Sequence, residues 1–400
     1  MDKEAFLKQY TVNRKHTDSV KWDNLKEKFG ATDLIPLWVA DTEFKMPKAA
    51  QQALQKRIEH GAFGYSLTPA DYYENYFNWQ KQRYGIELKQ DWLRFGNGVV
   101  EALSTCVQFL TRPNEAVMVL QPVYYPFMNV VEKNERQLVV SKLINENGAY
   151  RMDLADITKK IQQHHVKLLI LCSPHNPVGR VWQKAELEAL FEVCCQEKVL
   201  VISDEIHHDL IVDQNSQFVS ALEIKAGLYR DNLIVLDAPS KTFNLAGLTF
   251  SQLIIPNPQL RARYDEIVAR LACPSGNILG KVAASAAYSQ GQDWLEGLLD
   301  LLRANYAILK QTLTAYDQRI VLSPLQGTYL AWVDLSALVK PADLEALIIK
   351  QAKLAVDFGD WFGQGGSGHI RLNLATTPEI LKQALSQLTS ALDTYQNENK

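Results

Sequence analysis

The sequence contains no long apolar run and little cysteine. No stretch of about 18 consecutive apolar residues occurs, the length that a membrane-spanning helix needs. Residues 1–4 lack the apolar core of a secretory signal. The five cysteines are odd in number and form no Cys-x-x-Cys pair, which argues against a disulfide framework or a zinc site. We therefore expect a cytoplasmic protein with reduced thiols, no metal and no membrane partner.

The chain also lacks an excess of charge of either sign. Lys and Arg number 42, Asp and Glu number 45, and the formal net charge is −3. Binding of nucleic acid or of an acidic membrane requires a basic surface, so we expect neither partner. With 47% hydrophobic and 22% charged residues over 400 positions, the composition is typical of a globular protein with two domains or one large α/β unit.

Strand and helix patterns alternate between residues 95 and 255. Several of the expected strands are largely apolar, at 116–120, 166–171, 199–204 and 232–236. Such strands are typical of a mostly parallel sheet covered by helices on both faces. After Pro256 the pattern is mainly helical, with further strands near 328–333 and 369–374. We predict a large α/β domain at 46–289 and a smaller α+β domain formed by 1–45 and 290–400.

One lysine, Lys241, directly follows the last of these apolar strands. Pro239 stops the strand and Ser240 precedes the lysine. In an apolar pocket a lysine amine loses its proton readily, and the neutral amine forms Schiff bases with aldehydes. A surface lysine on a turn would have the same local sequence, so this stretch alone leaves both interpretations open.

The ends of the other strands carry residues with complementary chemistry. The turn Gly98-Val99-Val100 opens a helix, whose free N–H groups favour an anion such as phosphate. Tyr124, Asn176 and Asp204 each follow a strand, where open α/β sheets bind ligands. Arg371 adds a bidentate carboxylate binder. A Schiff-base lysine, a carboxylate, a phosphate cradle and a stacking aromatic are the requirements of pyridoxal 5′-phosphate.

Three segments make the chain recognisable. Residues 173–179 (SPHNPVG), 203–207 (SDEIH) and 240–247 (SKTFNLAG) resemble the class I/II aminotransferase superfamily of fold-type I. This resemblance covers nearly the whole chain and implies a large domain with a mostly parallel, seven-stranded sheet. Residues 19–23 and 38–44 resemble the cystathionine β-lyases of the MalY/PatB type.

The resemblance also implies a role for each site residue. Lys241 would form the Schiff base and move the Cα proton, and Asp204 would pair with the pyridinium nitrogen. Tyr65 would reach the phosphate of the neighbouring subunit, so that each site needs a homodimer. The remaining implied contacts are Asn176 to the ring 3′-oxygen, Tyr124 to the ring face, Gly98, Val99, Val100 and Ser240 to the phosphate, and Arg371, Ala40 and Asp41 to the substrate.

Two positions depart from the common pattern of the superfamily. Many aminotransferases have a phosphate-binding arginine where this chain has Thr249, so one full positive charge is missing. They also often have a tyrosine where this chain has His207. A histidine can still donate to the 3′-oxygen, though with a different pKa. A structural histidine at the start of a helix is the alternative for His207, and we interpret His208 as structural.

The expected activity is carbon–sulfur β-elimination on a small amino acid. We predict a lyase that cleaves L-cystathionine or a related cysteine S-conjugate to a thiol, pyruvate and ammonia. An aminotransferase of aromatic or broad specificity is the alternative enzyme, because both reactions begin with loss of the same Cα proton. A pyridoxal-phosphate-binding regulatory protein that acts through a protein partner is the alternative from another class.

Overall fold

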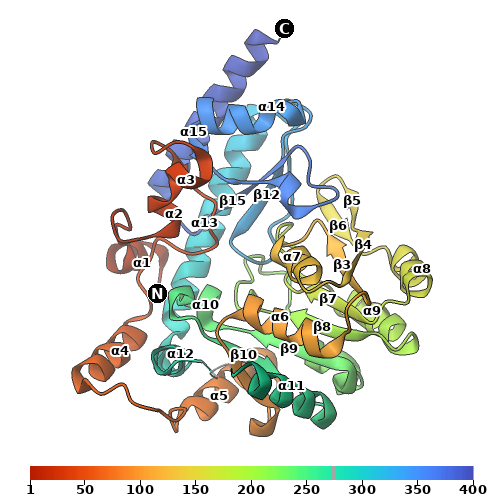
Figure 1. Cartoon of the computed structure of the whole chain (residues 1–400). Coiled ribbons are helices and arrows are strands. Elements are labelled where there is room, and N and C mark those ends of the chain that lie inside the picture. The colour runs from red at the N-terminus through yellow and green to blue at the C-terminus, as the bar shows by residue number, and fades with distance from the viewer. Residues whose placement is uncertain (273–275, 400) are drawn as a thin grey trace.

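A seven-stranded sheet forms the centre of the larger part of the molecule (Figure 1). The computed structural model describes residues 1–272 and 276–399. The strand order is β2-β10-β9-β8-β7-β3-β4, and β10 alone runs antiparallel to both of its neighbours. The predicted α/β class and seven-stranded sheet are confirmed. The strands are β2 (Leu93–Gly96), β3 (Ala116–Gln121), β4 (Gln137–Lys142), β7 (Leu168–Cys172), β8 (Leu200–Asp204), β9 (Leu233–Asp237) and β10 (Ser251–Ile254).

Helices cover both faces of this sheet because its central strands are apolar on both sides. In β3, Val117 and Val119 pack in one core cluster, whereas Met118 and Leu120 pack in another, as the alternation of side chains along a strand requires. The first cluster includes α6 (Val99–Leu110), α7 (Pro126–Lys133) and α11 (Pro258–Leu271). The second includes α5 (Tyr72–Tyr84), α8 (Leu154–His164), α9 (Lys184–Gln196) and α12 (Ile278–Gln290).

A four-stranded antiparallel sheet, in the order β11-β12-β15-β14, lies in the C-terminal part of the chain. Its strands are β11 (Val321–Leu322), β12 (Leu330–Asp334), β14 (Asp357–Phe358) and β15 (His369–Asn373). The accompanying helices are α13 (Gln292–Tyr316), α14 (Pro341–Ala346) and α15 (Pro378–Glu398). A small hairpin, β5 (Ile144–Glu146) with β6 (Ala149–Arg151), projects near the edge strand β4.

The N-terminal segment packs against this C-terminal region. It contains α1 (Lys3–Tyr10), α2 (Val20–Asp23), α3 (Leu25–Phe29) and β1 (Ile35–Pro36), and α4 (Lys48–His60) follows it. β1 pairs in parallel with β13 (Leu354–Ala355), so segments more than 300 residues apart lie side by side. The division at residues 46 and 290 stays a prediction.

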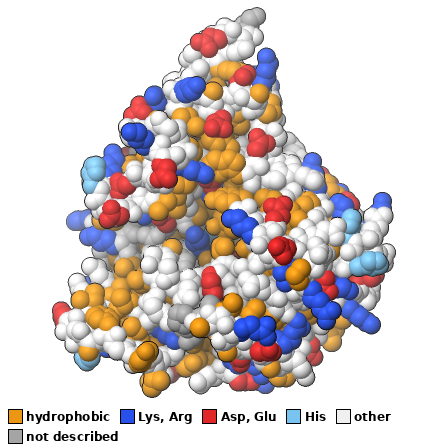
Figure 2. All heavy atoms as spheres, in the orientation of Figure 1, with side chains coloured by type: hydrophobic (Ala, Val, Ile, Leu, Met, Phe, Trp, Pro, Cys, Tyr) orange, Lys and Arg blue, Asp and Glu red, His pale blue; other side chains and the backbone are white. Residues whose placement is uncertain are grey.

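Within the described residues, none of the helices has the length and apolar character needed to cross a bilayer. Cys106, Cys172 and Cys194 are buried free thiols and Cys195 is exposed. Cys273 lies outside the described residues. Positive and negative side chains are interspersed over most of the face shown in Figure 2, which agrees with the near-neutral net charge.

Candidate active site

The candidate site is a cavity of about 250 Å³ at the carboxyl ends of β7, β8 and β9. Ten of the predicted site residues line it: Ala40, Gly98, Val99, Val100, Tyr124, Asn176, Asp204, His207, Ser240 and Lys241. Asn97, Glu101, Cys172, Ile206 and Ala246 complete the wall. A larger hollow of about 610 Å³ between α6 and α11 contains none of these residues, so the chemistry belongs to the smaller cavity.

Lys241 enters the cavity from a single helical turn, α10 (Pro239–Thr242), directly after β9. Its Nζ donates a hydrogen bond to the backbone oxygen of Ala40 at 2.7 Å. Burial lowers the pKa of Lys241 to about 8, although the nearby carboxylate of Asp41 opposes this shift. Much of the amine is therefore neutral, and nucleophilic, in mildly alkaline solution.

Asp204 ends β8, and its side chain is buried. One carboxylate oxygen accepts a hydrogen bond from the backbone nitrogen of Ile206 at 3.1 Å. Burial nevertheless raises the pKa of Asp204 to about 7, because a single hydrogen bond does not replace the hydration of a carboxylate. A cationic ring placed beside Asp204 would supply the missing partner.

His207 and Asn176 offer further polar atoms to the cavity. Burial, followed by the positive charges of Lys241 and Arg371, lowers the pKa of His207 well below its ordinary value, so its imidazole is neutral. Its Nδ1 is buried and has no hydrogen-bond partner among the residues that the structure describes, which is costly unless a ligand supplies one. Asn176 accepts a hydrogen bond from Arg371 Nη1 at 2.9 Å through its side-chain oxygen, so its amide nitrogen stays a donor.

The glycine turn before α6 forms the expected anion cradle. Gly98 has φ of 134°, a conformation that side chains other than hydrogen disfavour. The first N–H groups of a helix have no partner within the helix, and those of Val99 and Val100 belong to this first turn. Thr249 is exposed, and Lys241 is the one Lys or Arg side chain that the described residues contribute to the cavity wall.

Arg371 lies on β15, directly opposite Asp357 on β14, with which it forms a buried ion pair. It also donates to the backbone oxygen of Trp38 at 3.0 Å. These bonds hold the guanidinium rigidly. Its Nε has no partner within residues 1–272 and 276–399 and can bind a carboxylate. Neither Arg371 nor Asp41 is part of the cavity wall. Asp41 instead forms an ion pair with Arg14 at 2.6 Å.

Tyr65 stands apart from the other predicted residues. It lies between α4 and α5, and its side chain is fully exposed. It does not line the cavity of its own chain. A role for Tyr65 in this site therefore requires a second subunit.

Two contributors were absent from the predicted site. The Tyr329 hydroxyl donates to the same Ala40 oxygen as Lys241, at 2.8 Å. The Asn244 side chain accepts from Thr42 N at 3.1 Å and donates to Phe44 O at 2.8 Å. These contacts fix the N-terminal segment over the lysine. The Asn244 contact joins positions about 200 residues apart, and no local pattern signals it.

The side chains and backbone groups of the cavity wall fit pyridoxal 5′-phosphate. The wall combines a neutralisable lysine amine, a buried carboxylate short of partners, an orphaned imidazole nitrogen and a helix N-terminus. Burying polar groups without partners costs the folded protein free energy unless a ligand provides the partners. Together these features match the aldehyde, the ring nitrogen, a ring oxygen and the phosphate of this cofactor.

The chain belongs to the family described as aminotransferase class I and II, whose family model matches residues 32–388. It is 37% identical over 379 residues to cystathionine beta-lyase PatB of Bacillus subtilis, covering 94% of this chain and 97% of that protein. It is 29% identical over 384 residues to protein MalY of Escherichia coli, covering 95% and 97%.

Solved structures give the same relationship. Cystalysin from Treponema denticola, which contains pyridoxal 5′-phosphate, superposes with a TM-score of 0.91 at 33% identity, covering 96% of this chain and 98% of that one. The PLP-bound C-S lyase from Staphylococcus hominis superposes with a TM-score of 0.89 at 32% identity, covering 95% and 96%. The predicted superfamily and its MalY/PatB branch are confirmed.

Proposed function

We propose that this protein is a pyridoxal-phosphate-dependent carbon–sulfur β-lyase. With water, it would cleave L-cystathionine or a related cysteine S-conjugate to a thiol, pyruvate and ammonia. The observation that carries the proposal is that the Lys241 amine and the buried Asp204 carboxylate line the same cavity. The lyase names of PatB and of the Staphylococcus hominis enzyme support this reaction over others of the same family.

Each residue of the cavity wall would contact a different part of the cofactor. Lys241 would hold it covalently, Asp204 would face its ring nitrogen, and Tyr124 would cover its ring. The Gly98 turn and Ser240 would hold the phosphate, and His207 with Asn176 would face the ring oxygen. When bound, the cofactor supplies an electron sink for the pair of electrons left when the Cα proton departs.

The chain itself supplies the proton transfers and the orientation. With its pKa lowered to about 8, the amine of Lys241 can both accept and return a proton at neutral to mildly alkaline pH. Its hydrogen bond to Ala40 fixes where that amine points. Arg371, held by Asp357, would bind the substrate α-carboxylate and so place Cα near the lysine.

We propose that the active form is a homodimer in which Tyr65 completes the site of the neighbouring subunit. Three further apolar side chains of the same stretch, residues 58–67, are exposed: Ile58, Phe63 and Leu67. Figure 2 shows hydrophobic side chains gathered on the lower left, where Figure 1 places α4 and α5. Exposed apolar patches typically mark an interface. The partner's Tyr65 hydroxyl would also help to offset the cation missing at Thr249.

The domain division at residues 46 and 290 and a cytoplasmic location belong to the same proposal. The pairing of β1 with β13 supports a smaller unit built from both ends of the chain.

Pyruvate release from L-cystathionine without any keto acid tests the reaction. We expect a steady rate of pyruvate, homocysteine and ammonia formation. Alanine or an aromatic amino acid, which has no thiolate to expel, should give at most one slow turnover. The family membership favours an aminotransferase as the second candidate. Rapid reaction of aromatic amino acids only when a keto acid is supplied would support that candidate and contradict the lyase.

A further inference from the structure

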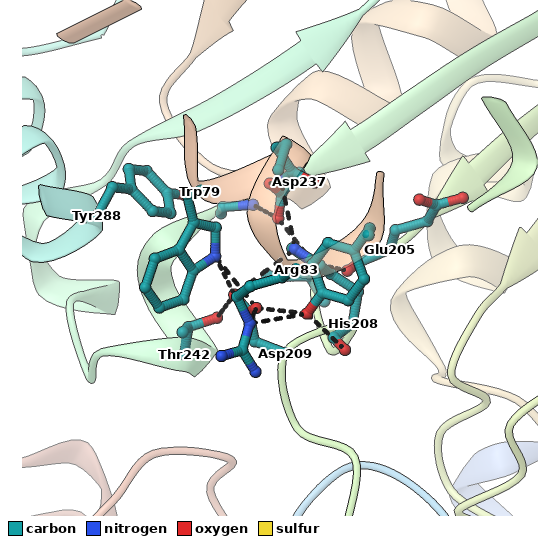
Figure 3. A network of polar contacts seen from close by, with 12 residues as sticks. Trp79, Arg83, Glu205, His208, Asp209, Asp237, Thr242 and Tyr288 are labelled. Carbon is teal, nitrogen blue, oxygen red and sulfur yellow. Dashed lines mark hydrogen bonds and ion pairs between the residues drawn. The ribbon is translucent and has the colours of Figure 1, made fainter. Parts of the chain in front are cut away.

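Figure 3 shows a buried polar network that includes Thr242, the residue that directly follows Lys241 in the chain. It joins three elements: α5, the turn after β8 and the turn after β9. The side chains that meet there are Tyr76, Trp79, Gln80, Arg83 and Tyr84 from α5, His208 and Asp209 after β8, and Asp237 and Thr242 around α10. Apart from His208 and Thr242, which directly follow His207 and Lys241, none of these residues is a chain neighbour of the cofactor positions assigned above.

Asp209 is the centre of this network, and its carboxylate is fully enclosed. It accepts hydrogen bonds from Trp79 Nε1 at 3.1 Å, from Arg83 Nε at 3.1 Å and from Tyr84 OH at 2.5 Å. All three donors come from α5, which therefore fixes the carboxylate. Burial would raise the pKa of Asp209, but His208, Arg83 and these bonds outweigh burial and lower it. Asp209 is thus held as a charged acceptor.

The fourth bond of Asp209 runs to the lysine turn. Thr242 Oγ1 donates to Asp209 Oδ2 at 2.9 Å, and Figure 3 shows the two side chains facing each other. Thr242 directly follows Lys241 in α10, and successive side chains on a helix point about 100° apart. Thr242 can therefore face the network while Lys241 faces the cavity.

A second bond ties the start of the same turn. Asp237 Oδ1 accepts from the backbone nitrogen of Ala238 at 2.7 Å. Tyr76 OH donates to Asp237 Oδ2 at 2.8 Å, and His208 Nδ1 lies 3.3 Å from Asp237 Oδ1. Burial would lower the pKa of His208, but Asp209 and Asp237 outweigh it and raise the pKa. The His208 imidazole thereby offsets the negative charge of Asp209 and Asp237, whose carboxylates hydrogen-bond to Thr242 and Ala238.

The lysine turn needs such an anchor because it is short. α10 has four residues, and a single helical turn has little stability of its own. Its position must come from side-chain contacts, and a shift of about 1 Å in a reacting group can cost a hundredfold in rate. The Asp209–Thr242 bond is the charged hydrogen bond that holds its C-terminal end.

We propose that Asp209 is a positioning residue for the lyase reaction: through the Thr242 hydroxyl it holds the lysine turn so that the Lys241 amine stays inside the cavity. This role rests on the proposed function of Lys241. Asp209 is not part of the cavity wall, so it would act on the amine only through Thr242. Its three hydrogen bonds to α5 hold the Asp209 carboxylate in place. The hydrogen bond from Thr242 then holds the lysine turn against that carboxylate.

Thr242→Val tests the contact with little change of shape, because valine keeps the size of threonine and removes only the hydroxyl. Thr242→Ser restores the hydroxyl without the methyl group. Thr158→Val is the matched control, since the Thr158 hydroxyl bonds a backbone oxygen within α8, away from the cavity. Thermal unfolding of all three variants establishes that they are folded.

The first measurement uses cofactor-free protein. Competitive acetylation across a pH series, followed by mass spectrometry of the peptide that contains Lys241, gives the pKa of its amine. We expect the pKa, which burial lowers to about 8 in the native protein, to rise by at least about one unit in Thr242→Val, because a released turn lets water reach the amine. Thr242→Ser and Thr158→Val should retain the native value. A merely stabilising contact would change the unfolding temperature and leave this pKa unchanged.

The second measurement is steady-state turnover of L-cystathionine by the holoenzyme. We expect kcat of Thr242→Val to fall by about tenfold to a hundredfold, with KM within about twofold of the native value and with recovery in Thr242→Ser. An unchanged Lys241 pKa in Thr242→Val, or equal damage in Thr242→Ser, would overturn the positioning role. Failure of the native protein to release pyruvate would contradict the proposed function alone, because the pKa comparison does not depend on the reaction.

Discussion

Replacing Asp204 by asparagine should stabilise the cofactor-free protein while destroying its activity. Burial raises the pKa of Asp204 from an ordinary value of 3.8 to about 7. Each pKa unit corresponds to about 1.36 kcal/mol, so holding this carboxylate ionised costs the folded protein about 4 kcal/mol. Asparagine has nearly the same shape and carries no charge, and it avoids that cost.

The stability difference between the native protein and Asp204→Asn should depend on pH. Because the folded-state pKa lies above the unfolded value, the folded protein binds the proton more tightly. Its stability therefore falls as pH rises from about 4 to about 7, and the loss is constant above that range. The free energy of unfolding of Asp204→Asn should exceed that of the native protein at pH 8, and the difference should shrink by about 2 to 3 kcal/mol at pH 5.

Urea unfolding of the cofactor-free proteins at pH 5, 6, 7 and 8 measures this difference. Asp231→Asn, which alters an exposed carboxylate, is the control and should show no comparable trend. With pyridoxal 5′-phosphate added, the native protein should become the more stable of the two. The ring cation of the cofactor would remove the cost of the ionised Asp204, and the variant has no such carboxylate. The loss of that pairing should lower kcat by about a thousandfold. A variant less stable than the native protein at pH 8 would refute the reasoning.

Three further predictions concern the remaining site residues. Lys241→Ala should abolish turnover, and borohydride should fix the cofactor of the native protein to the peptide containing Lys241; a label on a different lysine would contradict the assignment. Arg371→Gln should raise KM for L-cystathionine by about tenfold to a hundredfold, because a charged hydrogen bond contributes about 1.5–3 kcal/mol, and equal kinetics would show that the α-carboxylate binds elsewhere. Mixing Lys241→Ala with Tyr65→Phe subunits should restore activity, since one hybrid site carries neither change; verified exchange without recovery would mean that each site is built from one chain.

The sheet and the centre of the site followed from local signals. A run of apolar residues predicts a buried strand, and a parallel sheet brings the carboxyl ends of its strands together. This reasoning predicts that Asn176, Asp204 and Lys241 lie side by side, and all three line one cavity.

Contacts between distant segments could not be predicted in this way. Asp357 meets Arg371 because β14 and β15 are neighbours in the small sheet, and no spacing in the sequence announces that pairing. In the segment 35–41, only Ile35–Pro36 pairs with β13. Beyond it, the backbone turns toward the lysine, where Ala40 accepts two side-chain bonds. Tertiary contacts override local preference there.

The oxygen that receives both the Lys241 amine and the Tyr329 hydroxyl belongs to the main chain of residue 40. No codon change can delete it, because every amino acid carries the same carbonyl. A mutational scan would then record position 40 as tolerant of small side chains and give no sign that its backbone touches the nucleophile. Substitutions that divert the chain path, such as proline at position 41, would reveal it instead. Evolution is equally free to vary the side chain there, and to reshape the substrate pocket, without disturbing the lysine.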